Sequence, residues 1–110
     1  MRNSCNFTGK LVSDPKMFEG QGVNRVCFTL SVMRDYEDKE GNVYADFFDF
    51  TAWRDTADYI MRHFHKGDMM RVDNARAKVR MYEDSNGNKR RKIEFEVDGA
   101  CNVFRDKEED

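Results

Sequence analysis

The chain has 110 residues, of which 36% are charged and 39% are hydrophobic, and its formal net charge at pH 7 is −2. This length is enough for one domain with a modest core and is too short for two. The apolar runs are far shorter than a membrane span, and no charged-then-apolar leader precedes the first predicted strand, so we expect a cytoplasmic protein without a membrane segment.

The first half of the chain predicts three strands. Residues 5–12 alternate weakly between polar and apolar types and end at the turn signal Ser13-Asp14-Pro15. After a flexible corner at residues 20–22, residues 26–33 alternate clearly and predict a second strand. The charged turn at residues 37–42 returns the chain into a third strand, Val43–Trp53, which completes a long hairpin.

The strand Val43–Trp53 has two faces of different composition. Side chains of a strand point alternately to opposite faces, so the apolar set forms an ordinary core face: Phe48, Phe50 and Ala52. The other face is suited to solvent and carries Phe47, Asp49, Thr51 and Trp53. Large aromatic rings on a solvent-facing strand indicate a surface on which flat ligands stack.

The second half predicts one helix and two further strands. Residues 55–64 have the apolar spacing of a helix, with its buried face at Ala57, Ile60, Met61 and Phe64. Asp55 or Thr56 can cap this helix, and Lys66-Gly67 ends it. A long strand at residues 69–82, a turn at residues 84–88 and a last strand follow, and the last strand is expected to point these side chains inward: Ile93, Phe95 and Val97.

This order of elements predicts an all-β protein with one helix. Strand, long hairpin, helix and long hairpin is the element order of a five-stranded barrel of the oligonucleotide/oligosaccharide-binding (OB) fold, with long exposed hairpins. We expect the barrel to cover residues 1–104. A short acidic end at residues 105–110 is expected to be disordered.

Basic residues concentrate in one region. Residues 62–92 hold 10 basic and 4 acidic side chains, so an overall negative charge does not exclude a polyanionic partner. One face of the predicted strand there carries a stripe of cations that ends in an aromatic ring: Arg76, Lys78, Arg80 and Tyr82. Cations beside exposed aromatics suit single-stranded nucleic acid, with phosphates on the cations and bases on the rings. A plain solvated strand face is the alternative.

Other polar features have simpler interpretations. The run of Lys89, Arg90, Arg91 and Lys92 suits a solubilising edge strand and a nucleic-acid contact equally well. His63 and His65 lie at the end of the helix, where cations are favoured, and they have no further metal ligands at a suitable spacing. The three cysteines, Cys5, Cys27 and Cys101, form no CxxC motif and are not expected to form disulfides. We find no catalytic constellation and expect neither an enzyme nor a metal or cofactor site.

Together these segments resemble the bacterial single-stranded-DNA-binding proteins over about residues 6–103. The resemblance lies in FTGKLVSDP (residues 7–15), FTLSVMRDYEDKEGN (residues 28–42), the helix ending at Lys66-Gly67, and VRMYEDSNGNKRRKIEFEV (residues 79–97). It implies non-specific binding and protection of single-stranded DNA in replication, recombination or repair. The stacking aromatics of the family fall on Tyr36, Phe47, Trp53 and Tyr82. The cations expected to accompany them are Arg34, Arg54, Arg76, Lys78, Arg80, Lys89, Arg90 and Arg91.

The chain also departs from the family pattern. Tyrosine or phenylalanine replaces tryptophan at three of the four stacking positions, and Asp49 stands where the family often has a cation, so replacing Asp49 by arginine is expected to tighten binding. One extra residue near residues 73–75 calls for a bulge. The glycine-rich linker and acidic Asp-Phe tip of the family are missing, so recruitment of repair enzymes through a tail is not expected.

The resemblance implies a homo-oligomer, a tetramer rather than a dimer, encoded by a bacterium, a phage or a mobile element. The alternatives are a dimeric primosomal replication protein of the same fold, an RNA-binding OB protein, and a peptide-binding module.

Overall fold

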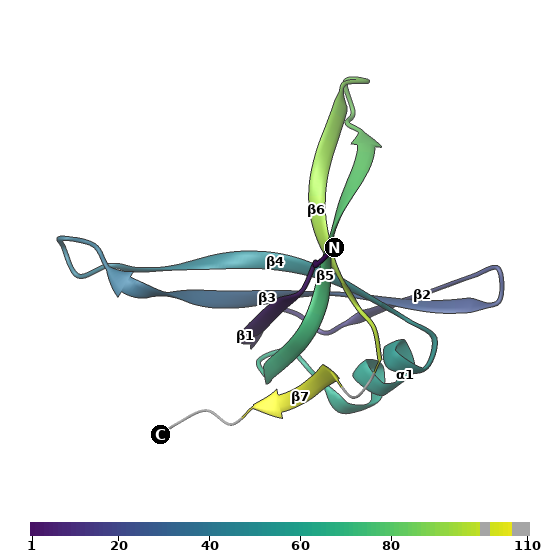
Figure 1. Ribbon diagram of the computed structural model, residues 1–110, viewed down its shortest axis with the longest axis horizontal. Helices are drawn as coiled ribbons and strands as arrows, with labels where there is room; N and C mark the ends of the chain where they lie inside the picture. Colours follow the sequence, from purple (N-terminus) through teal and green to yellow (C-terminus); the bar gives the residue numbers. More distant parts are fainter. Residues whose placement is uncertain (100–101, 107–110) are drawn as a thin grey trace.

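The computed structural model describes residues 1–99 and 102–106. Within these residues the chain forms strands and one helix in the order β1 (Cys5–Leu11), β2 (Lys16–Gly20), β3 (Val23–Glu37), β4 (Val43–Trp53), α1 (Arg54–His63), β5 (Met69–Glu83), β6 (Lys89–Val97) and β7 (Val103–Asp106). Figure 1 shows the β3–β4 and β5–β6 hairpins projecting from a common body in different directions. No helix of the described residues is long and apolar enough to cross a membrane.

The predicted five-stranded barrel is confirmed. The strands pair in the order β1–β3–β4–β6–β5, and β5 pairs again with β1, so the ring of strands closes. Every neighbouring pair in the ring is antiparallel except β4 and β6, which run parallel. Two strands that the sequence did not predict lie outside the ring: β2 pairs with β3, and β7 pairs with β5.

The core lies inside the ring and is closed at one end by α1. Phe28 of β3 stacks on Phe50 of β4 with ring centroids 5.0 Å apart, as their alternation with polar neighbours predicts. The helix contributes Ala57 and Ile60 to this core and its C-cap residue contributes Phe64, all at most 1% exposed. Met61 was predicted to join them and does not, because it lies at the edge of the buried face and is 36% exposed.

The helix also begins differently from the prediction. Trp53 is the extended N-cap residue, without a side-chain cap hydrogen bond, and Arg54 has a φ of 56°. The predicted caps were Asp55 and Thr56. They lie inside the helix because Trp53 is still paired with Arg25 in the sheet, so the chain turns directly from strand to helix.

Strand β1 has a bulge opposite it on β5 and a close approach to β3. The pairing of β1 with β5 shifts from Phe7 opposite Val72 to Cys5 opposite Ala75, so one extra residue is accommodated on β5. Asn74 takes a φ of 58° there, which confirms the predicted bulge. At the crossing of β1 and β3, a Cβ atom on Gly9 would lie 2.7 Å from the Ser31 carbonyl oxygen, so only glycine fits without displacement.

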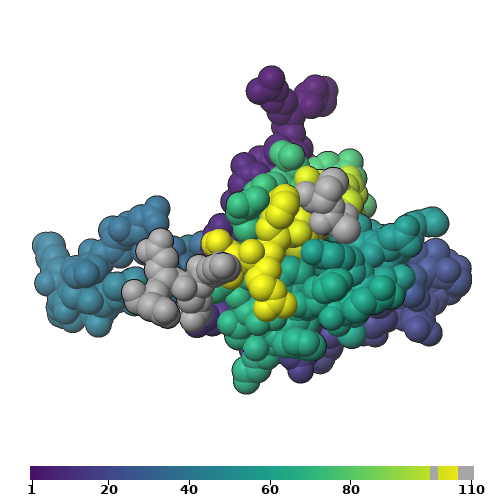
Figure 2. All heavy atoms as spheres, turned by 90° about the horizontal axis from the view of Figure 1, so that it is seen from below, coloured from purple at the N-terminus to yellow at the C-terminus, as the bar shows by residue number. Residues whose placement is uncertain are grey.

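Two further expectations from the sequence are wrong. Ile93 is 58% exposed, because it lies where the β5–β6 hairpin has already left the barrel. Arg105 and Asp106 are not disordered but belong to β7, which Figure 2 shows in yellow across the face formed by α1 and β5. Arg105 ion-pairs with Asp68 at 3.4 Å, and this contact, with the pairing to β5, orders the strand. Residues 107–110 and Cys101 lie outside the described residues, and Cys5 and Cys27 are free thiols.

Candidate nucleic-acid interface

The predicted stacking face of β4 exposes its two large rings. Phe47 is 66% exposed and Trp53 is 42% exposed. Thr51 was predicted on the same open face but is only 1% exposed, because the parallel strand β6 lies beside it. The Thr51 hydroxyl donates a 2.5 Å hydrogen bond to a Glu94 carboxylate oxygen. The open part of this face is therefore divided into two stacking positions separated by a covered segment.

Asp49 lies between these positions with its charge already partnered. Its carboxylate is 2.7 Å from the Lys92 ammonium and accepts a 2.6 Å hydrogen bond from the Thr29 hydroxyl. Partial burial works to raise the pKa of Asp49, but the hydrogen bonds from Lys92 and Thr29 outweigh it and leave the pKa below its ordinary value. The same pair raises the pKa of Lys92. Asp49 thus neutralises a cation of the neighbouring hairpin.

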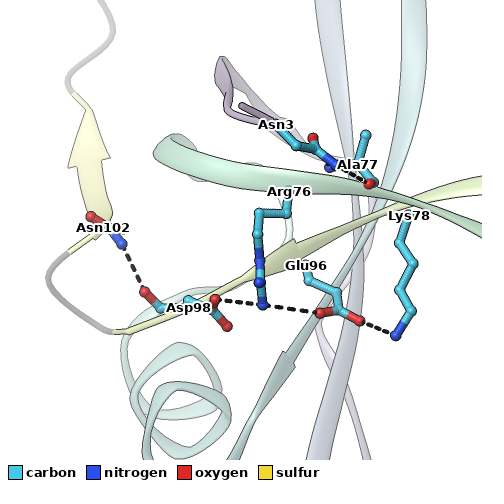
Figure 3. Close-up of polar contacts among 7 residues, drawn as sticks. All are labelled: Asn3, Arg76, Ala77, Lys78, Glu96, Asp98 and Asn102. Atoms are coloured by element: carbon cyan, nitrogen blue, oxygen red, sulfur yellow. Dashed lines mark hydrogen bonds and ion pairs between the residues drawn. The ribbon is translucent and has the colours of Figure 1, made fainter. Parts of the chain in front are cut away.

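The stripe of cations on β5 shares one face, as predicted, but each member faces a carboxylate. Figure 3 shows the inner part of this arrangement, in which Arg76 contacts Asp98 at 2.7 Å and Glu96 at 3.6 Å. Lys78 contacts the other oxygen of Glu96 at 3.0 Å. Further along the hairpin, Arg80 lies 3.5 Å from Glu94. The acidic partners alternate on β6, opposite the stripe, so the inner half of the hairpin is nearly neutral.

The outer half of the β5–β6 hairpin divides its basic run between two faces. Tyr82, 46% exposed, lies opposite Arg90 in the register, and Arg90 ion-pairs with Asp84 at 3.0 Å. Lys89 and Arg91 alternate with Arg90 and therefore lie on the opposite face. Neither has a carboxylate partner within the described part of the chain. The four basic residues of this run do not form one continuous surface.

The first hairpin places Arg34 and Tyr36 away from Phe47. Arg34 forms an ion pair with Asp46 at 2.9 Å, and Asp46 precedes Phe47 on β4, so the two point to opposite faces. The Tyr36 hydroxyl lies 3.5 Å from an Arg34 nitrogen, which keeps the ring beside Arg34. The hydrogen bond to Asp46 raises the pKa of Arg34, and Arg34 in turn lowers the pKa of Asp46. An extended ligand that contacts both Phe47 and Tyr36 therefore has to pass around the β3–β4 hairpin.

The tips of the β3–β4 and β5–β6 hairpins carry the same five-residue turn, a repeat that was not predicted from the sequence. In each turn an aspartate accepts hydrogen bonds from the backbone N–H groups two and four residues later, and a glycine with positive φ occupies the fourth position. The two turns are Asp38-Lys39-Glu40-Gly41-Asn42 and Asp84-Ser85-Asn86-Gly87-Asn88. The spacing Asp-x-x-Gly-Asn is the signal that could have identified them. The turns fix the shape of both tips before any ligand binds.

The pairing of the unpredicted strand β2 with β3 brings two further residues to this surface. Phe18 of β2 lies opposite Arg25 of β3, and Arg25 lies opposite Trp53 of β4. Two neighbouring hollows of about 370 and 330 Å³ lie between this part of the sheet and the β5–β6 hairpin, and both are lined by Arg25 and Arg80. Together these two hollows are called the groove. The apolar pair Met17 and Phe18 between Lys16 and Glu19 is the only local signal for β2, and it is too short to be distinguished from a loop.

The remaining predicted residue, Arg54, lies at the junction of β4 and α1. It is exposed and, among the described residues, has no carboxylate partner. No group of three or more His, Cys, Asp or Glu side chains that could hold a metal ion occurs in residues 1–99 and 102–106.

Comparisons with known proteins place the chain in a family. The model of the single-strand binding protein family matches residues 2–103. A single-stranded DNA-binding protein 2 from Listeria monocytogenes is 35% identical over 88 residues, which cover 79% of this chain and 54% of the relative. A single-stranded DNA-binding protein 1 from Clostridium acetobutylicum is 34% identical over 90 residues, covering 80% of this chain and 81% of the relative. A single-stranded DNA-binding protein from Halalkalibacterium halodurans is 32% identical over 79% of this chain. The chain spans about half the length of the Listeria and Halalkalibacterium relatives.

Proposed function

The chain belongs to the single-strand binding protein family, and we propose that it binds and protects single-stranded DNA without sequence preference during replication, recombination or repair. The observation that carries the proposal is the pair of exposed rings on β4, Phe47 and Trp53, in a barrel whose second hairpin is basic. A base stacked on an aromatic ring contributes about 1–3 kcal/mol whatever the base, so such a surface binds strands of any sequence.

In this proposal the β3–β4 and β5–β6 hairpins contact different parts of the DNA. Bases stack on Phe47 and Trp53 and, on the other hairpin, on Tyr82. The sugar-phosphate backbone follows the cations of the β5–β6 hairpin and Arg54. Arg34 and Tyr36 contact the strand on the far side of the first hairpin, which requires the strand to wrap around that hairpin. Wrapping of this kind suits a surface whose contacts are spread over projecting elements rather than gathered in one pocket.

The ion pairs of the β5–β6 hairpin predict a weak salt dependence for a protein with so many cations. Each phosphate that binds a free cation makes log K fall with log salt by about 0.7 on a single strand. When a phosphate binds Arg76, Lys78 or Arg80, it displaces a carboxylate of β6 or Asp98, which then attracts a counterion again. The slope is therefore expected to be smaller than the number of cations at the interface indicates.

Trp53 allows a direct test because it is the single tryptophan of the chain. The protein is titrated with oligo-dT of increasing length at two salt concentrations while tryptophan emission is followed. Quenching that saturates and weakens with salt is expected. Absence of quenching, together with absence of salt-dependent binding by fluorescence anisotropy of a labelled oligonucleotide, contradicts the proposal.

Charge reversal tests the stripe separately from the rings. Lys78→Glu and Arg80→Glu are each expected to weaken binding to all sequences by the same factor, since they remove phosphate contacts rather than base contacts. Arg62→Glu on α1 is the control, because Arg62 is exposed and lies on the helix rather than on either hairpin. Unchanged affinity in the two stripe variants removes the stripe from the site.

We further propose that the protein acts as a cytoplasmic homotetramer. Its mass in solution measured by light scattering tests this, and a dimer would favour a primosomal replication protein of the same fold. A competition of labelled oligo-dT with oligo-U distinguishes DNA from RNA as the ligand. Binding to neither would favour a peptide as the partner of the aromatic face.

A further inference from the structure

The row formed by Phe18, Arg25 and Trp53 crosses three adjacent strands on one face of the sheet. Phe18 is opposite Arg25 in the β2–β3 register, and Arg25 is opposite Trp53 in the β3–β4 register. The guanidinium carbon of Arg25 lies 5.0 Å from the Phe18 ring centroid and 5.7 Å from the Trp53 ring centroid. Both distances are within cation–π range, so the two rings hold the guanidinium between them.

Arg25 differs in its charge balance from Arg80 and Lys92, two other cations of the groove. Among the described residues it has no carboxylate partner, whereas Arg80 is paired with Glu94 and Lys92 with Asp49. The carboxylates of Glu94 and Asp49 are thus already paired with other cations. A guanidinium held by rings keeps its N–H donors available, because a cation–π contact uses the face of the group and not its edge.

The two rings of the row remain accessible for stacking. Phe18 is 45% exposed and Trp53 is 42% exposed. They lie two strand spacings apart, about 10 Å, with the cation between them. All three residues line a hollow of about 310 Å³ at the end of β2, and Arg25 also lines both hollows below the β5–β6 hairpin. The row therefore continues the groove beyond Trp53.

We propose that Phe18 and Arg25, together with Trp53, form a nucleotide-binding subsite that extends the DNA path onto the β2–β3 hairpin. Arg25 binds the phosphate between two bases, one stacked on Trp53 and the next on Phe18. The inference rests on the proposed function, because it assumes that Trp53 stacks on a base of a single strand. It assigns the phosphate beside Trp53 to Arg25, which has no carboxylate partner among the described residues, rather than to the stripe on β5.

The test uses anisotropy of a labelled oligo-dT with three variants of the full chain. Arg25→Met removes the charge but keeps a long apolar stem between the rings, and Phe18→Leu removes the ring but keeps the apolar bulk. Arg25→Met is expected to bind several-fold more weakly, with a salt slope smaller by about 0.7. Phe18→Leu is expected to bind about fivefold or more weakly with an unchanged slope, because stacking does not release counterions. Arg62→Met on α1 is the matched control and should behave as the wild type.

A second measurement reports on the subsite even if a variant is less stable. In the double variant Phe18→Trp, Trp53→Phe, the single tryptophan stands at position 18, and its emission should change when anisotropy shows saturated binding. No change at saturation overturns the subsite, as does an Arg25→Met protein with the affinity and slope of Arg62→Met. Failure of the wild type itself to bind overturns the proposed function instead, so the two outcomes are distinguishable.

Discussion

Removing the charge of Asp49 is the perturbation that most sharply tests how the two hairpins cooperate. In the folded protein Asp49 is 2.7 Å from Lys92 and 2.6 Å from the Thr29 hydroxyl. Asp49→Asn keeps a side-chain oxygen for the hydroxyl and frees the Lys92 ammonium. We expect this variant to bind single-stranded DNA more tightly than the wild type, because a cation inside the groove becomes available to a phosphate. Asparagine is a cleaner choice than arginine, which would place a second cation against Lys92.

The size of the effect follows from counterion release. One additional phosphate contact makes the slope of log K against log salt steeper by about 0.7 on a single strand. Between 200 and 50 mM salt, a fourfold change, the advantage of Asp49→Asn over the wild type should therefore grow by about 2.6-fold. The cost in folding stability should stay below about 1 kcal/mol, because both side chains of the pair are more than a third exposed.

The assay is anisotropy of a labelled oligo-dT at several salt concentrations at pH 7, with thermal unfolding measured alongside. Asp73→Asn is the matched control, since it makes the same change in net charge at an exposed pair with Arg71, away from the groove. In a Lys92→Met background the gain from Asp49→Asn should disappear. If Asp49→Asn and Asp73→Asn give the same affinity and slope, only net charge matters, and the reasoning about Lys92 is refuted.

The remaining predictions concern the barrel and the tip of the first hairpin. Gly9→Ala should lower the free energy of unfolding by about 1–3 kcal/mol, because the new methyl group would lie 2.7 Å from the Ser31 carbonyl oxygen. Gly20→Ala, with nothing within 4 Å of the added atom, should change it little in the same urea titration, and equal effects would contradict the role assigned to the crossing. The hydrogen bond from the Tyr44 hydroxyl, with those from the turn backbone, lowers the pKa of Asp38 to about 2. Because this folded pKa lies below the unfolded value of about 3.9, the stabilisation of the turn is complete above pH 4 and is lost as the pH falls through about 2, and an NMR titration midpoint near 4 for the Asp38 carboxyl would contradict it.

Much of the fold could be predicted because it depends on local patterns. Alternation with period two identified the buried and open faces of β3 and β4, and spacing with a helical period identified α1. The predictions failed where a strand leaves the barrel. Ile93 continues the apolar alternation of β6, but the hairpin at that point has no partner to bury it. Likewise β2 and β7 carry too few residues for a periodic signal, and they pair with the stretches of β3 and β5 that the barrel pairing leaves open on one side.

The candidate site divides in the same way. The sequence by itself determined that Phe47 and Trp53 share an open face and that Arg76, Lys78 and Arg80 share another, since neighbours two apart on a strand always point the same way. Only the tertiary structure decided which charges meet: carboxylates of β6 neutralise the stripe, Lys92 neutralises Asp49, and Arg25 lies between two rings without a carboxylate partner in the described part of the chain. The physical reason is that these contacts depend on the register between strands distant in the chain, which backbone hydrogen bonds and barrel closure fix and no local pattern encodes.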